Sequence, residues 1–191
     1  NVRRELEKEV SDRKARGATL GAIGLALAEL MYEKVQHRQP SEIGDSKELS
    51  KDERDSRIAE LQASLDILNA VIAESAISED VGWRARYLAA LHLIDLEREE
   101  ESAKLLQAIS ETSWQRLTTH VYFLLGNYFS FTKCDVEKAL DCYMKMAEAA
   151  LKFNDNRAYG VAVVLGAVTS FQTYRFSQGI SMAVSILNNP S

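Results

Sequence analysis

The sequence holds only two prolines, Pro40 and Pro190, so residues 41–189 contain none of the residues that break a helix by removing a backbone donor. Ala, Leu, Glu and Lys are plentiful, and these residues lose little conformational freedom on entering a helix. Hydrophobic residues make up 46% of the chain and charged residues 27%, as in ordinary globular proteins. We therefore predict an all-α protein with a substantial core.

Residues 1–36 are predicted to form one long N-terminal helix, because apolar and small residues recur at helical spacing. Each glycine inside a helix costs roughly 1 kcal/mol, so the presence of Gly17, Gly21 and Gly24 indicates that another helix approaches closely. The alternative is a homo-oligomer that forms through this Gly17/Gly21/Gly24 helix. The longest apolar stretch, residues 18–28, is too short to span a bilayer, so we expect no membrane insertion.

A polar segment, residues 37–53, separates this helix from the rest of the chain and contains Pro40 and Gly44. Such a composition predicts a flexible loop. Ser50 and Glu53 have the spacing of a capping box for the helix that follows. That helix is expected over about 54–75, and its predicted buried stripe consists of Ile58, Leu61, Leu65, Leu68 and Ile72.

Residues 54–191 are predicted to form a helical-repeat domain, with hairpins at about 81–111, 114–153 and 156–188. The chain as a whole is expected to be one domain. A gap-free offset of 40 residues relates the last two hairpins, and a fixed period of this size is typical of solenoids. The matched pairs are Val121 and Val161, Leu125 and Leu165, Gly126 and Gly166, Phe131 and Phe171, Ala139 and Gly179, and Leu140 and Ile180.

Residues 124–150 (LLGNYFSFTKCDVEKALDCYMKMAEAA) resemble a tetratricopeptide repeat, with Leu125-Gly126 in the first helix and Ala139, Tyr143 and Ala147 in the second. The resemblance implies antiparallel hairpins stacked as a short right-handed solenoid. The spacing from Gly126 to Ala139 is one residue longer than the family pattern, and the hairpin at 81–111 lacks the glycine. Another helical bundle or repeat is the alternative fold.

The resemblance also implies a binding groove lined by the first helix of each hairpin. Around Gly126 the groove positions are His120, Phe123, Asn127 and Ser130, and on the preceding hairpin they are Arg84, Tyr87 and His92. The corresponding positions near Gly166 are small and apolar, so we expect another repeat to cover them: Gly160, Val163, Ala167 and Ser170.

No arrangement typical of catalysis is found in the sequence, so we expect no enzyme and no cofactor. The three histidines, His37, His92 and His120, have no metal-ligand spacing. The two cysteines, Cys134 and Cys142, do not form a CxxC motif, and free thiols favour a reducing, cytoplasmic location. The net charge of −5 argues against nucleic acid, whose phosphates need clustered Lys and Arg.

We therefore predict a protein–protein interaction scaffold or adaptor that binds a partner peptide or helix in the groove. One alternative is a regulatory domain that senses a peptide or small ligand. Another is a helical exchange domain for Ras-type GTPases, which the run from Asp135 through Asn154 to Arg175 resembles. Since the chain begins at Asn1 rather than Met, we also expect it to be part of a larger protein.

Overall fold

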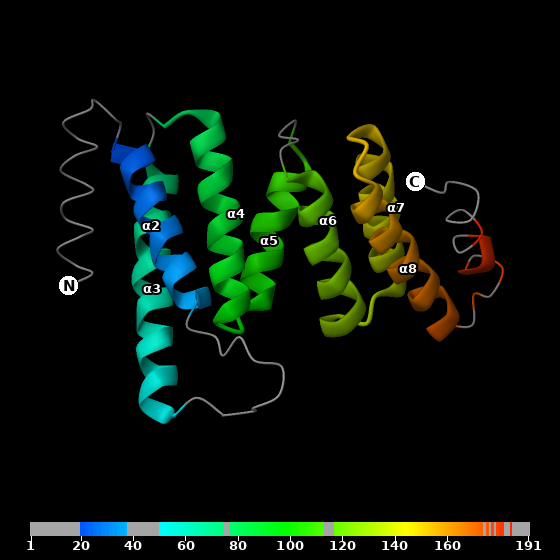
Figure 1. Ribbon diagram of the computed structural model, residues 1–191, viewed down its shortest axis with the longest axis horizontal. Coiled ribbons are helices and arrows are strands. Elements are labelled where there is room, and N and C mark those ends of the chain that lie inside the picture. Colours follow the sequence, from blue (N-terminus) through cyan, green and yellow to red (C-terminus); the bar gives the residue numbers. More distant parts are fainter. Residues whose placement is uncertain are drawn as a thin grey trace. The chain divides into compact units, whose positions relative to one another are not determined.

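The computed structural model describes residues 20–37, 50–74, 77–112 and 117–173, and beyond these only residues 175, 177, 179–181 and 184. Every regular element in these residues is a helix, which confirms the all-α prediction. By its internal contacts the chain divides into two compact units, Asn1–Leu105 (unit 1) and Leu106–Ser191 (unit 2). The elements in Figure 1 are α2 (Leu20–His37), α3 (Lys51–Ala73), α4 (Glu79–Asp95), α5 (Glu99–Ser110), α6 (Thr118–Asn127), the π-helical turn η1 (Tyr128–Thr132), α7 (Val136–Lys152) and α8 (Asn156–Gln172).

The glycines of α2 face other parts of unit 1. A Cβ on Gly24 would lie 2.6 Å from Cγ2 of Val71 on α3, and a Cβ on Gly21 would overlap Cγ2 of Ile77. Because neither glycine carries a side chain, α3 and the segment after it can approach the α2 backbone. Both glycines therefore serve packing within the chain, while Gly17 and the rest of the predicted helix at 1–19 lie outside the described residues.

Helix α3 begins at Lys51, three residues before the predicted start. The Ser50 hydroxyl accepts from the backbone N–H of Glu53 at 3.3 Å, and the Glu53 carboxylate accepts from the N–H of Ser50 at 2.8 Å. This capping box makes Glu53 the third helical residue, so the helix has to start at Lys51. Residues 38–49 of the predicted loop lie outside the described part of the chain.

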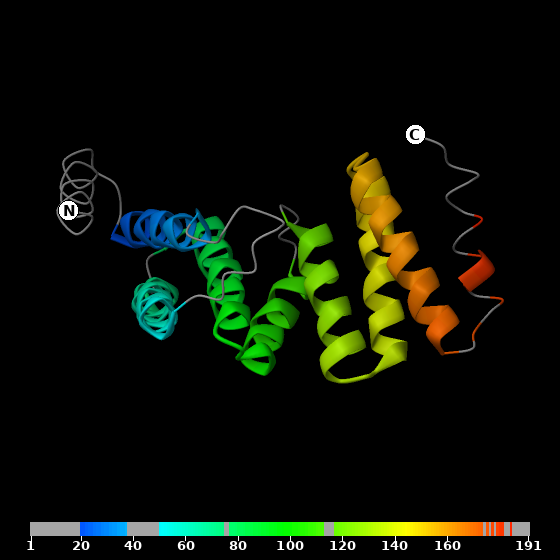
Figure 2. The same cartoon turned by 60° about the horizontal axis from the view of Figure 1, so that its bottom comes forward.

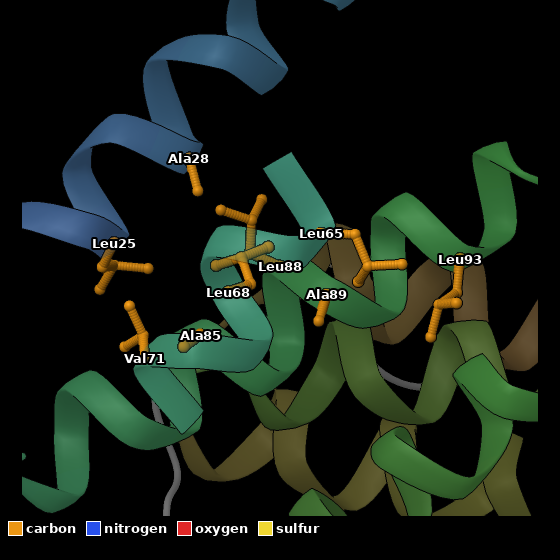
Figure 3. Close-up of a cluster of buried hydrophobic side chains, with 9 residues drawn as sticks. All are labelled: Leu25, Ala28, Leu65, Leu68, Val71, Ala85, Leu88, Ala89 and Leu93. Atoms are coloured by element: carbon orange, nitrogen blue, oxygen red, sulfur yellow. The ribbon is translucent and has the colours of Figure 1, made fainter. Parts of the chain in front are cut away.

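The core of unit 1 is formed where α2, α3 and α4 pack together. Three members of the predicted α3 stripe are buried there, but Ile58 is 52% exposed because it lies on the first, solvated turns of the helix. Helix α5 then folds back on α4, and the Ser102 hydroxyl donates to the carbonyl of Ala90 at 2.8 Å. Figure 3 shows one cluster of these core side chains, which consists of Leu25, Ala28, Leu65, Leu68, Val71, Ala85, Leu88, Ala89 and Leu93.

In unit 2, α6 and α7 form a tight hairpin, and α8 packs on α7; the three lie side by side in both views (Figures 1 and 2). At Gly126 of α6 the missing Cβ leaves room for the ring of Tyr143 on α7. Asp135 caps α7 by accepting from the N–H of Lys138 at 3.2 Å. Both small residues of the hairpin, Gly126 and Ala139, are buried.

A π-helical turn at Tyr128–Thr132 lies between Gly126 and Ala139. A π turn closes its hydrogen bonds over five residues and so accommodates one residue more than an α-helical turn. The additional residue therefore lies at the end of the first helix, and Gly126 and Ala139 keep their places in the interface between the helices.

Helix α8 closely matches its predicted range, and Asp155 caps it by accepting from the N–H of Ala158 at 2.9 Å. Of the four positions that we expected to be covered, Val163, Ala167 and Ser170 are buried, whereas Gly160 is partly exposed and has nothing within 4 Å of an added Cβ. Most of the last predicted helix, 176–188, lies outside the described residues.

Candidate functional site

The predicted groove residues of unit 1, Arg84, Tyr87 and His92, all lie on α4, which α2 partly covers. Arg84 is partly exposed and forms an ion pair with Glu29 of α2. Tyr87 is only 9% exposed, and burial raises the pKa of its hydroxyl well above the usual range. The prediction of an open groove at Tyr87 and His92 is therefore wrong, because both side chains point into the core of unit 1.

His92 is fully buried, and both nitrogens of its ring are engaged. Nδ1 lies 2.8 Å from the carbonyl of Leu88, which can only accept, so Nδ1 carries the hydrogen. In the neutral ring Nε2 then accepts from the hydroxyl of Ser64 on α3 at 2.8 Å. The ring also lies against Tyr32 of α2, with 4.7 Å between ring centroids. Burial lowers the pKa of His92, which favours this neutral state.

The four predicted residues of unit 2 lie together on one side of α6 and η1. His120 is exposed, and the other three are half-buried. The ring of His120 stacks on that of Phe123, with centroids 5.8 Å apart and planes 15° apart. We call this set (His120, Phe123, Asn127 and Ser130) the α6 face. Its spacing of three and four residues keeps all four side chains accessible on the same side of the helix.

The polar end of the α6 face is held from inside the hairpin by Tyr143. The Tyr143 hydroxyl donates to Oδ1 of Asn127 at 3.0 Å, and Ser130 is a second hydrogen-bond partner. Burial is the main reason why the pKa of Tyr143 is raised, so the hydroxyl keeps its hydrogen at neutral pH. Since Oδ1 of Asn127 accepts from Tyr143, the amide nitrogen of Asn127 is directed away from this bond.

A hollow of about 410 Å³, which the sequence reasoning missed, lies within unit 2 where the end of α5 meets α6 and α7. Roughly 300–1,000 Å³ is the usual size of small-molecule sites. None of the sequence-predicted groove residues lines it. The lining residues are Ile109, Ser110, Thr112, Thr118, Val121, Tyr122, Lys145, Glu148, Ala149, Lys152 and Phe153.

The hollow is lined by both apolar and polar side chains. The Ser110 hydroxyl donates to the carbonyl of Gln107 at 2.8 Å, so its oxygen can still accept from a ligand, and the Thr112 hydroxyl donates to the carbonyl of Ile109 at 2.7 Å. Lys145 is paired with Asp141 at 2.8 Å, and its ammonium lies 6.0 Å from the ring centroid of Tyr122. The sequence signal for these polar lining residues was weak, because outward-facing Lys and Glu also occur on any solvated helix.

Both cysteines are free; Cys134 is exposed, whereas burial raises the pKa of Cys142 to about 11. Within the described ranges, no group of three or more His, Cys, Asp or Glu side chains is placed to hold a metal ion. A membrane span was sought in the same residues, and none of their helices is long and apolar enough to cross a bilayer.

The chain matches no protein-family model, and none of the curated proteins is similar to it.

Proposed function

We propose that this chain is a non-catalytic interaction scaffold that binds a peptide or helix of a partner protein on the α6 face. The observation that carries the proposal is the grouping of four accessible side chains, His120, Phe123, Asn127 and Ser130, on one side of α6 and η1. Stacked aromatic rings supply rigid contact area at low entropic cost, and an amide that a buried hydroxyl orients supplies directional hydrogen bonds.

The chemistry of the α6 face favours a partner segment with an apolar anchor and few charges. None of the four side chains is a Lys, Arg, Asp or Glu, so the face offers no strong attraction to a charged peptide. The stacked rings of His120 and Phe123 can receive an aliphatic or aromatic side chain. Asn127 and Ser130 can then bond to the backbone of the partner.

We further propose that the hairpins belong to a tetratricopeptide-like right-handed solenoid in the cytoplasm. The burial of Tyr143 beside Gly126 and of Ala139 in the facing helix supports the hairpin type. The π turn supports it as well, because it absorbs the additional residue without moving these small residues out of the interface. The free thiols Cys134 and Cys142 support a reducing compartment.

The proposal is tested by recovering partners from an extract of the native source with the wild-type chain and two variants. The double variant Phe123→Ala/Asn127→Ala alters the α6 face, and Met144→Ala truncates a side chain of α7 that is 48% exposed. Circular dichroism establishes that both variants fold. A partner that is retained by Met144→Ala and lost by the double variant supports the α6 face, whereas an unchanged partner set contradicts it.

A second candidate function, sensing of a small ligand, is favoured by the hollow beside Tyr122 and Lys145. A ligand bound there raises the unfolding temperature, because it binds only the folded state. The test is a thermal-shift screen of wild type and of Ala149→Leu, which places extra methyl groups in the hollow. A compound that stabilises the wild type but not Ala149→Leu supports the site, and equal stabilisation of both counts against it.

A further inference from the structure

His92 joins three helices of unit 1 through groups that neither proposed function uses. It lies on α4, accepts from Ser64 of α3, and contacts the ring of Tyr32 on α2. The Ser64 hydroxyl also lies 3.4 Å from the carbonyl of Ala28 on α2. All three helices therefore meet at one buried, titratable ring.

Few charged groups act on this ring. From its own helix, Asp95 exerts a favourable effect on the protonated form, but the Gln36 amide of α2 already donates to the Asp95 carboxylate at 2.9 Å. On α2 the titratable group that faces the ring is Tyr32. Burial and Asp95 raise the pKa of Tyr32 to about 12, so its hydroxyl is neutral. On α3 the group that faces the ring is the uncharged hydroxyl of Ser64. Arg57, also on α3, exerts a Coulombic effect that lowers the pKa of Tyr32. In the described part of the chain, the hydrogen-bond partners of the His92 ring are the Leu88 carbonyl and the Ser64 hydroxyl, and neither is a carboxylate.

Protonation would reverse the hydrogen bond between His92 and Ser64. Nε2 of His92 would become a donor, and the Ser64 oxygen would have to accept from it. The Ser64 hydroxyl would therefore have to rotate and donate its hydrogen to the carbonyl of Ala28. At 3.4 Å that bond is long for a hydroxyl donor. The ring would also carry a full charge in a site with no solvent exposure, which is unfavourable unless the charge is paired.

We propose that His92 is a proton-operated latch that holds α2 against α3 and α4 while the ring is neutral and releases α2 when the ring is protonated. Other polar ties of α2 include the hydrogen bond from Gln36 to Asp95 of α4 at 2.9 Å. They also include two partly exposed ion pairs, Lys34 with Glu60 at 3.2 Å and Glu29 with Arg84, and such pairs contribute little. Release of α2 would uncover its apolar contacts on α3 and α4, including Leu65, Leu68 and Leu88. Unit 1 would then expose an apolar surface only at low pH.

The direction of the pH effect follows from proton linkage. Burial lowers the pKa of His92 in the closed unit below the ordinary value of 6.5, so the opened unit binds the proton more tightly. Stability from the neutral ring is therefore complete above pH 6.5 and is lost as the pH falls below it. While one proton is taken up on opening, the opening equilibrium of α2 rises about tenfold per pH unit.

The test is hydrogen exchange, read by mass spectrometry on the full chain between about pH 7.5 and 5 and corrected for intrinsic exchange rates. In the wild type the protection of α2 amides should fall as the pH drops below 6.5, by at most about tenfold per pH unit, while α7 of unit 2 keeps its protection. In His92→Gln the protection of α2 should not depend on pH, and the control His120→Gln should behave as the wild type. A pH-independent α2 in the wild type, or the same loss in His92→Gln, would overturn the latch.

A measurement on the wild type alone covers the case in which His92→Gln does not fold. In NMR spectra taken as the pH falls, the imidazolium signal of His92 should grow together with a second set of α2 signals. A His92 ring that titrates near pH 6.5 while the α2 signals stay unchanged would contradict the proposal.

Discussion

A Cβ placed on Gly126 would lie 2.8 Å from Cδ1 of Tyr143, well inside the contact distance of two carbon atoms. Tyr143 has no solvent exposure, and its hydroxyl is fixed by Asn127, so the ring cannot move aside. This pair sets how closely α6 and α7 approach each other. It also joins the buried side of the hairpin to the α6 face, since Asn127 belongs to both.

Gly126→Ala should therefore destabilise unit 2 by about 1–3 kcal/mol, the usual cost of overpacking a core. The matched control is Gly160→Ala on α8, where nothing lies within 4 Å of the added Cβ. That change should stabilise the chain by roughly 0.5–1 kcal/mol, because alanine loses less entropy than glycine in a helix. Urea unfolding of the two variants measures both effects, and equal stabilities would disprove the close contact.

Deletion of Phe131 should be tolerated, because η1 holds one residue more than an α-helical turn. Phe131 is 71% exposed, so its loss removes little core packing. The shortened chain should keep its helical circular dichroism and a cooperative thermal transition. Deletion of Leu125, a buried residue of the regular helix α6, should shift the register and abolish that transition. Two equally damaging deletions would show that the π turn does not hold the additional residue.

Local signals in the sequence predicted the helices well, because caps and apolar spacing act within a few residues. Ser50 with Glu53 caps the helix that was expected to follow it. The π turn was visible only as an unexplained residue between Gly126 and Ala139. Its type could not be predicted, since propensities do not distinguish an inserted helical residue from a longer loop.

The predicted groove residues are accessible only where neighbouring helices leave them uncovered. The α6 face depends on spacing within one helix, so its four residues do lie together. Tyr87 and His92 also lie on one helix, α4, but α2 covers them. Because α2 and α4 are distant in sequence and linked by no local pattern, only the tertiary structure shows that this side of α4 is buried.

The titration of Tyr32 gives a prediction at high pH. Burial first, and then Asp95, raises the pKa of Tyr32 from 10.0 to about 12. Between these values the folded unit keeps a proton that the unfolded chain loses, so stability is complete below pH 10 and falls as the pH rises toward 12. Tyr32→Phe should lose less stability over this range than the wild type, with urea unfolding at each pH as the measurement. Parallel stability curves would show that Tyr32 titrates as in the unfolded chain.

The most direct measurement for the α6 face is photo-crosslinking from single positions of the full chain in an extract of its source. A photoreactive phenylalanine replaces Phe123 in one variant and Met144 on α7 in the other, so that both carry the same probe on accessible sites of unit 2. We expect position 123 to capture a discrete partner that position 144 does not capture, and His120→Ala in the same chain to reduce that crosslink. Identical products from positions 123 and 144, or none from position 123, would contradict a partner site on α6.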